Sequence, residues 1–360
     1  MDLDVAVVGA GFSGLLALHL LRERGLRVHA FDEAGNVGGT WWWHAYPGSH
    51  LDTEGHLYQY TFSERLYRDW GWSERHPAGY EVQRWFRFVA DRLDLRRSIS
   101  VRTRVVSIEA ADGGWAVRTD DGGVARARHV VACTGRLPRE PDVVVGAFEG
   151  LVLRTAAWPE DGHDLSGRRV GLLGTTAAAI QLAPWIVGKV ASLAVVANGP
   201  RDVLARENPV YGWRERDDYR DGFAALRETP PSVAPLAPDR AAMRARLDDP
   251  GLVDLLVPDA GSGRVVLDDG WLELFARPEV TAVPWHDLAR VRGEGLELAD
   301  GTVHELDVLV VTDEFDAGEP TVGRIADAQG VHHVVAPAGG GTVSFDLIRQ
   351  VEAVVEEIAE

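Results

Sequence analysis

Cysteine, methionine and lysine are scarce in this sequence. Its 360 residues include one cysteine, Cys133, two methionines and one lysine, Lys189. A single thiol can form neither an intrachain disulfide nor a zinc site of several thiolates, so disulfide-stapled and zinc-finger classes are excluded. Nearly all the basic charge is arginine, which indicates a coding bias rather than a function.

Basic residues and long apolar segments are also scarce. Lysine and arginine total 37 against 55 acidic residues, which gives a formal net charge of −18. Nucleic acids and anionic membranes both favour basic surfaces, so neither is expected as a partner. Two long uncharged stretches, residues 5–21 and 170–188, are interrupted by glycine, threonine or serine and do not resemble membrane spans. The acidic start is unlike a signal peptide, and we expect a cytoplasmic protein.

The sequence does contain a repeated strand–turn–helix–strand pattern. Hydrophobic residues make up 46% of the chain, and its length predicts about two domains. One repeat predicts a strand at residues 4–8, a helix at 15–24 and a strand at 27–31. The other predicts a strand at 168–173, a helix at 180–190 and a strand at 192–197. Two such units predict an α/β fold with two Rossmann-like dinucleotide-binding domains, one inserted into the other.

The turn of the first unit carries three spaced glycines. Gly9, Gly11 and Gly14 follow the first strand and open the helix, with Ser13 among them. The first glycine permits the tight turn, the second lets a pyrophosphate approach the backbone, and the third lets the helix pack on the strand. Asp32 ends the next strand, where a carboxylate can bind a ribose hydroxyl. The pattern predicts a dinucleotide without a 2′-phosphate, FAD or NAD, at the helix N-terminus.

The residues after the second strand distinguish these two cofactors. Gly38-Gly39-Thr40-Trp41 is followed by Tyr46-Pro47-Gly48 and Asp52, and a later strand ends in Cys133-Thr134-Gly135. Between the two units stands Phe148-x-Gly150-x-x-x-Arg154-x-x-x-Trp158-Pro159. With these motifs the sequence resembles the class B flavoprotein monooxygenases, and within them the Baeyer–Villiger monooxygenases. The resemblance implies an FAD-dependent oxidoreductase in which NADPH reduces the flavin and O2 then serves to oxidise a ketone or a soft heteroatom of a small or medium organic substrate.

The same resemblance implies which residues form the site. Asp52 matches the family's aspartate beside the flavin and nicotinamide, and Arg240 matches in register its active-site arginine, so both are candidate catalytic residues. An arginine there would stabilise a developing anion, and an aspartate would hold and tune it. The implied FAD ligands are Gly9, Gly11, Ser13, Gly14, Asp32, Gly39, Thr40, Trp41, Asp52, Tyr58, Val105 and Thr134.

Departures from the family pattern lie on the nicotinamide side. The second glycine motif is Gly174-Thr175-Thr176-Ala177-Ala178-Ala179, so Thr176 carries a Cβ where a pyrophosphate would approach the backbone. Asn198 stands where the family has an arginine for the 2′-phosphate of NADP, and Arg201 follows three residues later. Two further departures are Arg154, in place of a histidine, and Thr312-Asp313-Glu314, in place of a second Ala-Thr-Gly-like element. We predict that FAD binding is retained and that NADPH binding is weakened, altered or lost.

Several kinds of function remain open at this point. The first is a monooxygenase that is reduced by another route or by loosely bound NAD(P)H. The second is an FAD enzyme that no longer uses NADPH, such as an oxidase, a dehydrogenase or a non-redox cyclase or isomerase. A non-catalytic flavoprotein is the third. The divergence from a catabolic family motivates the hypothesis of a role in the biosynthesis of a secondary metabolite.

The domain bounds follow from the two units. We expect a discontinuous FAD-binding domain, residues 1–149 plus 306–360, and a nicotinamide-type domain at 150–305 with an insertion at about 201–259. The insertion is shorter than the family's and the usual C-terminal extension is missing, which would leave the flavin site open to a bulky substrate or covered by a homodimer. The turn at 338–342 would return the chain to the flavin. The alternating histidines 44, 50 and 56 lack a second cluster, so no metal ligand is expected.

Overall fold

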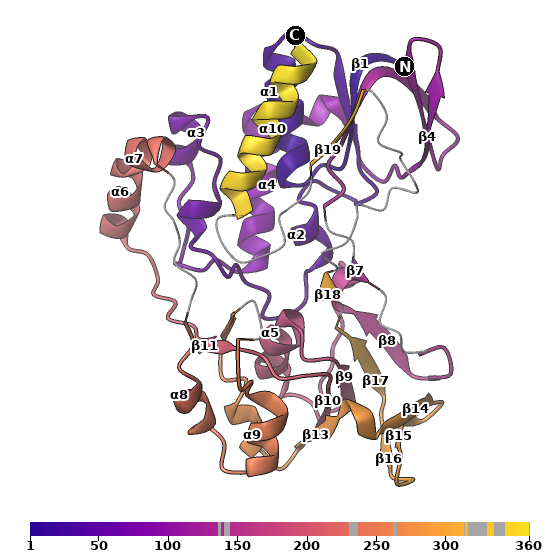
Figure 1. The fold of residues 1–360 in the computed structure, drawn as a ribbon, viewed down its shortest axis with the longest axis vertical. Helices are drawn as coiled ribbons and strands as arrows, with labels where there is room; N and C mark the ends of the chain where they lie inside the picture. Colours follow the sequence, from indigo (N-terminus) through magenta and orange to yellow (C-terminus); the bar gives the residue numbers. More distant parts are fainter. Residues whose placement is uncertain are drawn as a thin grey trace.

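The computed structural model describes residues 1–135, 138–139, 145–229, 237–261, 265–312, 314–315, 330–334 and 343–359. Two sheets with parallel central strands dominate this part of the chain, one in the upper and one in the lower half of Figure 1. The predicted turn at 338–342 lies outside the described residues. None of the described helices is both long enough and apolar enough to span a lipid bilayer.

The first sheet belongs to the amino-terminal unit. Its order is β3-β2-β1-β6-β5-β4, with β19 paired to β6. Strands β3, β2, β1 and β6 run parallel, whereas β6, β5 and β4 form an antiparallel meander. All but the first residue of β1 are buried, because helices and the meander cover both faces of this strand. The strands are β1 (Asp2–Val8), β2 (Val28–Phe31), β3 (Ile99–Ser100), β4 (Val105–Ala111), β5 (Gly114–Thr119), β6 (Val124–Ala132) and β19 (Val331–His333).

Helices from both ends of the chain cover this sheet. Leucines recur at helical spacing in α1, and residues of α10 such as Val351 and Val355 are buried in the same core cluster (Figure 1). Because β19 and α10 join the amino-terminal elements, the first unit is discontinuous. Its helices are α1 (Phe12–Glu23), α2 (Thr40–Trp43), α3 (Glu64–Asp69), α4 (Gly79–Arg92) and α10 (Val343–Ala359).

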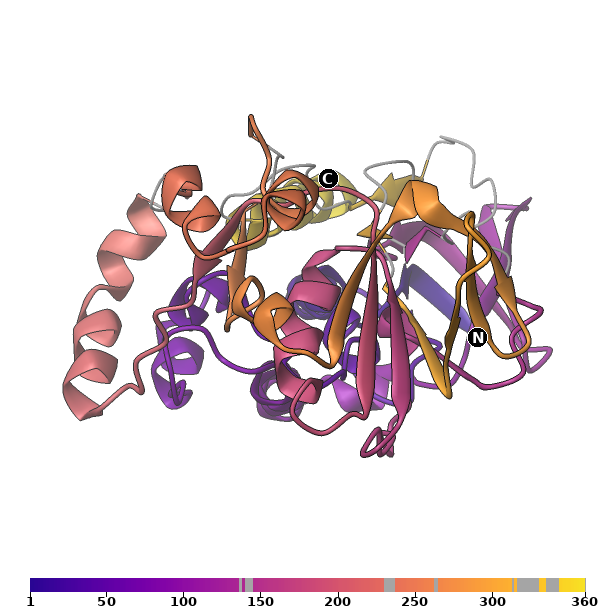
Figure 2. The same ribbon diagram turned by 90° about the horizontal axis from the view of Figure 1, so that it is seen from below.

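The second sheet has five parallel strands in the order β13-β10-β9-β17-β8, which Figure 2 shows side by side. Helix α5 (Ala177–Ile186) follows β9 and packs on this sheet. The boundary expected at residue 306 is wrong, because the apolar strand β17 pairs with β8 and β9 inside this sheet and the chain returns to the first sheet only at β19. The strands are β8 (Leu151–Arg154), β9 (Arg169–Leu173), β10 (Ser192–Ala197), β13 (Val280–Pro284) and β17 (Val308–Val311).

Smaller elements complete the second unit and join it to the first. Helices α6 and α7 project to one side (Figures 1 and 2), where Arg216 Nε donates to Trp72 O at 3.0 Å. The insertion holds β11 (Val203–Ala205), α6 (Trp213–Asp221), α7 (Phe223–Glu228), α8 (Arg240–Arg244) and α9 (Pro250–Leu256). The other elements are β12 (Val266–Asp268), β14 (Leu288–Arg292), β15 (Gly295–Leu298), β16 (Val303–Glu305) and the pair β7 (Pro138–Arg139) and β18 (Glu314–Phe315).

Candidate functional site

The turn between β1 and α1 lies against other backbone with no room for side chains. Gly9 has φ +101°, and a Cβ on it would overlap Cys133 O. A Cβ on Gly14 would overlap Gly9 O, and one on Gly11 would lie 3.2 Å from Gly39 Cα. Gly11 is the N-cap of α1, and no side chain caps this helix. Its first N–H groups are therefore left for an external acceptor such as a phosphate.

Asp32 reaches back to this turn from the end of β2. Its Oδ2 accepts from Ala10 N at 2.5 Å and its Oδ1 from Ala34 N at 2.8 Å. Burial raises the pKa of this carboxyl above its ordinary value. A carboxylate has about four lone-pair positions, so two remain for the hydroxyls of a ribose. Thr103 N donates to Asp32 O at 2.9 Å, which brings Val105 at the start of β4 to the same end of the sheet.

The segment after β2 closes the other side of the turn. Gly39 precedes α2, and a Cβ on it would lie 2.9 Å from Gly11 Cα, so the two glycines hold the segments in contact. Trp41 Nε1 donates to Tyr58 Oη at 3.0 Å. Burial raises the pKa of Tyr58 to about 12, which keeps the phenol neutral. Thr40 and Trp41 in α2 thus lie beside the glycine turn.

A buried hydroxyl without a partner marks the end of β6. Thr134 Oγ1 is enclosed and forms no hydrogen bond with the described residues. Buried polar atoms are nearly always paired, so an unpaired one suggests a ligand. The uncapped α1, the glycine contacts, the Asp32 carboxylate and this hydroxyl together fit FAD. The structure brings to this end of the first sheet Gly9, Gly11, Ser13, Gly14, Asp32, Gly39, Thr40, Trp41, Tyr58, Val105 and Thr134.

Asp52 lies where the first unit meets α5 of the second. Its Oδ1 accepts from Gln181 Nε2 at 3.2 Å. Gln181 is buried and also contacts Tyr46 and His50. Sequence reasoning missed Gln181, because a single glutamine inside an apolar helix gives no signal until the facing loop is known.

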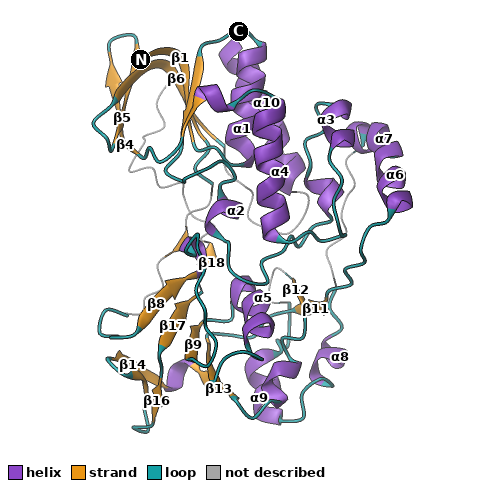
Figure 3. Ribbon diagram, turned by 180° about the vertical axis from the view of Figure 1, so that it is seen from behind, coloured by secondary structure: helices purple, strands orange, loops and turns teal. Residues whose placement is uncertain are grey.

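Arg240 does not stand beside Asp52, and that expectation is wrong. Its Nε and Nη2 donate to the two carboxylate oxygens of Asp202 at 2.8 and 2.9 Å. Helix α8, which Arg240 opens, lies in the lower part of the molecule, far from α2 (Figures 1 and 3). The physical reason is the buried Asp202 just before β11, which needs a cation and is neutralised by this bidentate pair.

Another arginine, Arg206, which follows β11, does lie near the junction. Its side chain is 1% exposed, and its Nε lies 3.3 Å from Asp269 Oδ1. Its Nη1 has no hydrogen-bond partner among the described residues. Burial and then the Arg206 charge lower the pKa of His50, two residues before Asp52. Nothing in the local sequence distinguished this arginine, because its burial depends on two segments distant in sequence.

The turn between β9 and α5 is closed by its own side chains. Thr176 is the N-cap of α5, and its Oγ1 accepts from Ala179 N at 3.4 Å. Thr175 N donates to Asn198 Oδ1 at 2.9 Å, and the Thr175 hydroxyl lies 2.8 Å from the same oxygen. Arg201 Nε donates to Thr175 O at 3.2 Å, so this cation does reach the turn. Two N–H groups of this turn, those of Thr175 and Ala179, are thus engaged by protein side chains, whereas at the α1 turn Ala10 N is engaged by Asp32 and no side chain caps the helix.

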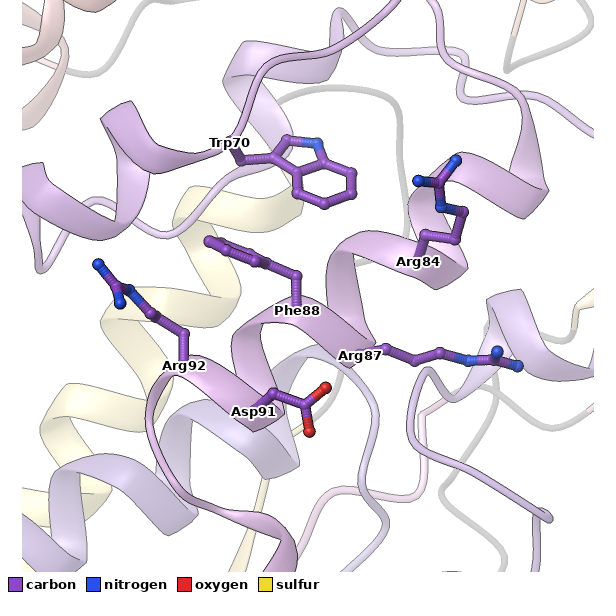
Figure 4. A pocket seen from close by; sticks show the side chains of 6 residues that line it. All are labelled: Trp70, Arg84, Arg87, Phe88, Asp91 and Arg92. Carbon is purple, nitrogen blue, oxygen red and sulfur yellow. The ribbon is translucent and has the colours of Figure 1, made fainter.

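A separate hollow of about 630 Å³ lies on the outer face of α4. Figure 4 shows Trp70 above Phe88, with arginines around them, and these two rings have centroids 5.2 Å apart. The lining contains none of the predicted cofactor residues, and its acidic member is paired with Arg96. The hollow is thus distinct from the dinucleotide turn. It is lined by Trp70, Arg84, Arg87, Phe88, Asp91 and Arg92.

Comparison with known proteins agrees with this geometry. Residues 7–70 match the model of the NAD(P)-binding Rossmann-like domain. The chain is 39% identical to acetone monooxygenase (methyl acetate-forming) of Gordonia sp. (strain TY-5), over 90% of this chain and 72% of that enzyme. It is 31% identical to a Baeyer–Villiger monooxygenase of Pseudooceanicola batsensis, over 88% of this chain and 69% of that protein.

Solved structures show the same relationship. Cyclohexanone monooxygenase with ε-caprolactone bound matches with a TM-score of 0.90 at 28% identity, over 99% of this chain and 87% of that one. Oxidised steroid monooxygenase bound to NADP matches with a TM-score of 0.85 at 27% identity, over 100% of this chain and 85% of that one. With the FAD turn, these likenesses confirm the resemblance drawn from the motifs. The chain is an FAD-binding oxidoreductase that belongs to the Baeyer–Villiger monooxygenase family.

Proposed function

We propose that this chain inserts one atom of O2 beside the carbonyl of a small ketone, using electrons from a nicotinamide nucleotide that it binds loosely. The observation that carries the proposal is the contrast between the two helix N-termini. The α1 terminus is uncapped and lined by glycine, whereas the α5 terminus is capped by Thr176. The ketone is suggested by the similarity to an acetone monooxygenase that forms methyl acetate.

Each part of the site would have a defined task. FAD, when bound, supplies the two-electron carrier that reacts with O2. The α1 amides would bind its pyrophosphate, Asp32 would accept hydrogen bonds from its ribose, and α2 would exclude water beside it. Asp52 would place a negative charge where the flavin side of the first unit meets α5. In the overall reaction the ketone and O2, with NAD(P)H and a proton, yield an ester, water and NAD(P)⁺.

The nicotinamide nucleotide would bind weakly and with little preference for a 2′-phosphate. At the β9–α5 turn the N–H groups of Thr175 and Ala179 are engaged by side chains, and Asn198 is neutral where a 2′-phosphate would need a cation. Arg201 at the turn supplies some attraction for a phosphate. These contacts favour a high KM for both NADPH and NADH rather than the loss of binding.

The deciding experiment begins with the purified yellow protein under anaerobic conditions. We expect millimolar NADPH or NADH to bleach the flavin, and air with acetone then to give methyl acetate. Bleaching without ester would overturn the ketone as substrate. If neither nucleotide bleaches the flavin, the second candidate, an FAD enzyme independent of nicotinamide, replaces this proposal, and the closed turn at α5 is the observation that favours it.

Asp52 is tested by the substitution Asp52→Ala. We expect the variant to keep FAD, because the described contacts of the dinucleotide turn do not involve Asp52, and to lose about 100-fold or more in kcat, a loss typical of removing one electrostatic group. Flavin absorbance per protein and initial ester formation measure the two effects. Full activity with normal FAD content would exclude Asp52 as a catalytic residue.

A further inference from the structure

We propose that Gln181 is a positioning residue that fixes the carboxylate of Asp52 and ties it to the nicotinamide-side helix α5. This inference rests on the proposed function, in which Asp52 is the catalytic carboxylate. Gln181 lies in the second turn of α5, and its Nε2 donates to Asp52 Oδ1 at 3.2 Å. The segment it contacts belongs to the other dinucleotide unit.

The Gln181 amide uses its whole hydrogen-bonding capacity on that segment. Its Oε1 accepts from Tyr46 Oη at 2.9 Å and from His50 N at 3.4 Å. Its Nε2 donates to His50 O at 3.2 Å as well as to Asp52. An amide has two acceptor and two donor positions, so all four are engaged.

These partners also determine which way the amide faces. The backbone N–H of His50 can only donate, while its carbonyl and a carboxylate accept. Gln181 Oε1 must therefore face the N–H, and Nε2 must face Asp52. A reversed amide would place its oxygen against two other acceptors, Asp52 Oδ1 and His50 O, and its NH2 group against the donor His50 N. The orientation that binds Asp52 is thus enforced by two other contacts, those to the N–H and the carbonyl of His50.

The backbone of the two units is packed tightly enough to hold this arrangement. Gly48 has φ +82°, and a Cβ on it would overlap both Gln181 O and the Trp185 ring. His50 Nδ1 lies 2.8 Å from Gly48 O, which braces the loop between Gly48 and Asp52. Gln181 is 3% exposed, so water does not compete for its amide. Gln181 in helix α5 therefore fixes the position of one carboxylate oxygen of Asp52.

The proposal is tested by a double-mutant cycle on the FAD-loaded enzyme. The variants are Asp52→Ala, Gln181→Leu and the double variant, and the readouts are kcat and the visible circular dichroism of bound oxidised FAD. We expect Gln181→Leu to lower kcat about 10-fold, as outer-shell partners do, with little change in the KM for ketone. We expect it to change kcat less than about twofold when Asp52 is already alanine, because coupled sites are non-additive.

Two further variants keep the outcome decisive. Gln181→Glu retains an acceptor for Tyr46 and His50 N but replaces the donor to Asp52 by a second carboxylate, so it should reproduce the loss even if Gln181→Leu folds poorly. Gln59 is a matched control, since it is also buried and accepts from Trp72 Nε1 at 2.8 Å and donates to Tyr67 O at 3.0 Å. Gln59→Leu should lower Tm and leave the flavin dichroism unchanged.

The results separate this inference from the proposed function. Additive effects of Asp52→Ala and Gln181→Leu on both readouts, or Gln181→Glu with wild-type dichroism and kcat, would overturn the positioning role. If the wild-type enzyme makes no ester, the proposed function fails. The double-mutant cycle measured by the visible circular dichroism of bound FAD still reports whether Gln181 acts on the flavin through Asp52. Non-additive dichroism would then support the inference by itself.

Discussion

At the scale of single residues, the dinucleotide turn depends on three glycines, because there is no room for a Cβ atom at their positions. Gly9, Gly11 and Gly14 were predicted from spacing alone, and each faces backbone that a Cβ would strike or crowd. Such positions can be inferred from sequence because a strand, a sharp turn and a helix leave glycine as the residue that fits. Arg240 shows the opposite case, because an ion pair with Asp202 depends on where a distant carboxylate is buried.

The substitution Gly11→Ala tests the FAD turn. Its Cβ would lie 3.2 Å from Gly39 Cα and would project where a pyrophosphate approaches, so we expect FAD content to fall about 10-fold or more while the fold is retained. Flavin absorbance per protein and far-ultraviolet circular dichroism measure these two properties. Gly188→Ala is the control, since nothing lies within 4 Å of its Cβ. Normal FAD content in Gly11→Ala would contradict the assigned turn.

At the scale of elements, the two strand–turn–helix units differ in whether a side chain caps the N-terminus of the helix. Helix α1 begins at a glycine without a cap, and α5 begins at Thr176, whose side chain accepts from its own helix. The sequence showed that Thr176 carries a Cβ at this position. It did not show that the Thr176 hydroxyl caps the helix, or that Thr175 N donates to Asn198. At α5 a protein side chain thus engages a helix N–H, whereas no side chain caps α1, and weaker nucleotide binding at α5 stays a prediction.

The substitution Thr176→Gly should partly restore the second turn. Loss of the capping oxygen frees an N–H at the start of α5 at a cost of a few tenths of a kcal/mol, about what glycine costs at an N-cap. We expect the KM for NADPH to fall about threefold or more, by analogy with gaining one charge-assisted hydrogen bond. FAD content should not change. A KM that stays constant or rises would show that this turn does not limit nucleotide binding.

At the scale of the whole molecule, the two units are joined by packed loops and by hydrogen bonds between them. The loop at Gly48 packs on α5, and Asn208 of the insertion exchanges hydrogen bonds with the backbone of His76 at 2.7 and 3.1 Å. Several histidines are buried in and around these contacts.

A homodimer that covers the flavin site stays a prediction, and light scattering would refute it if the protein is a monomer with a closed flavin pocket.

Burial of histidines predicts a loss of stability in mild acid. Burial lowers the pKa of His44 to about 4, so below pH 6.5 the unfolded chain binds a proton that the folded chain excludes. For His44 this costs about 2 kcal/mol of the free energy of unfolding between pH 8 and pH 5. The other histidines whose pKa values are lowered mainly by burial are His19, His29, His50, His56, His76 and His129.

Urea unfolding at several pH values checks this expectation. The wild-type free energy of unfolding should fall as pH drops from 8 to 5, and His44→Gln should reduce that fall by about 2 kcal/mol, since glutamine does not titrate in this range. An equal pH dependence in the wild type and in His44→Gln would show that His44 does not contribute.

The sequence by itself determined the α/β class, the two dinucleotide units and FAD as the cofactor, because these depend on local rules: apolar strands, glycine turns and an acidic residue at a strand end. Tertiary structure decided the rest. It put β17 in the second sheet, paired Arg240 with Asp202, buried Arg206 and set Gln181 against Asp52. These outcomes depend on which distant segments meet. A buried charge or amide takes its partner from whatever segment packs against it, and no local pattern encodes that choice.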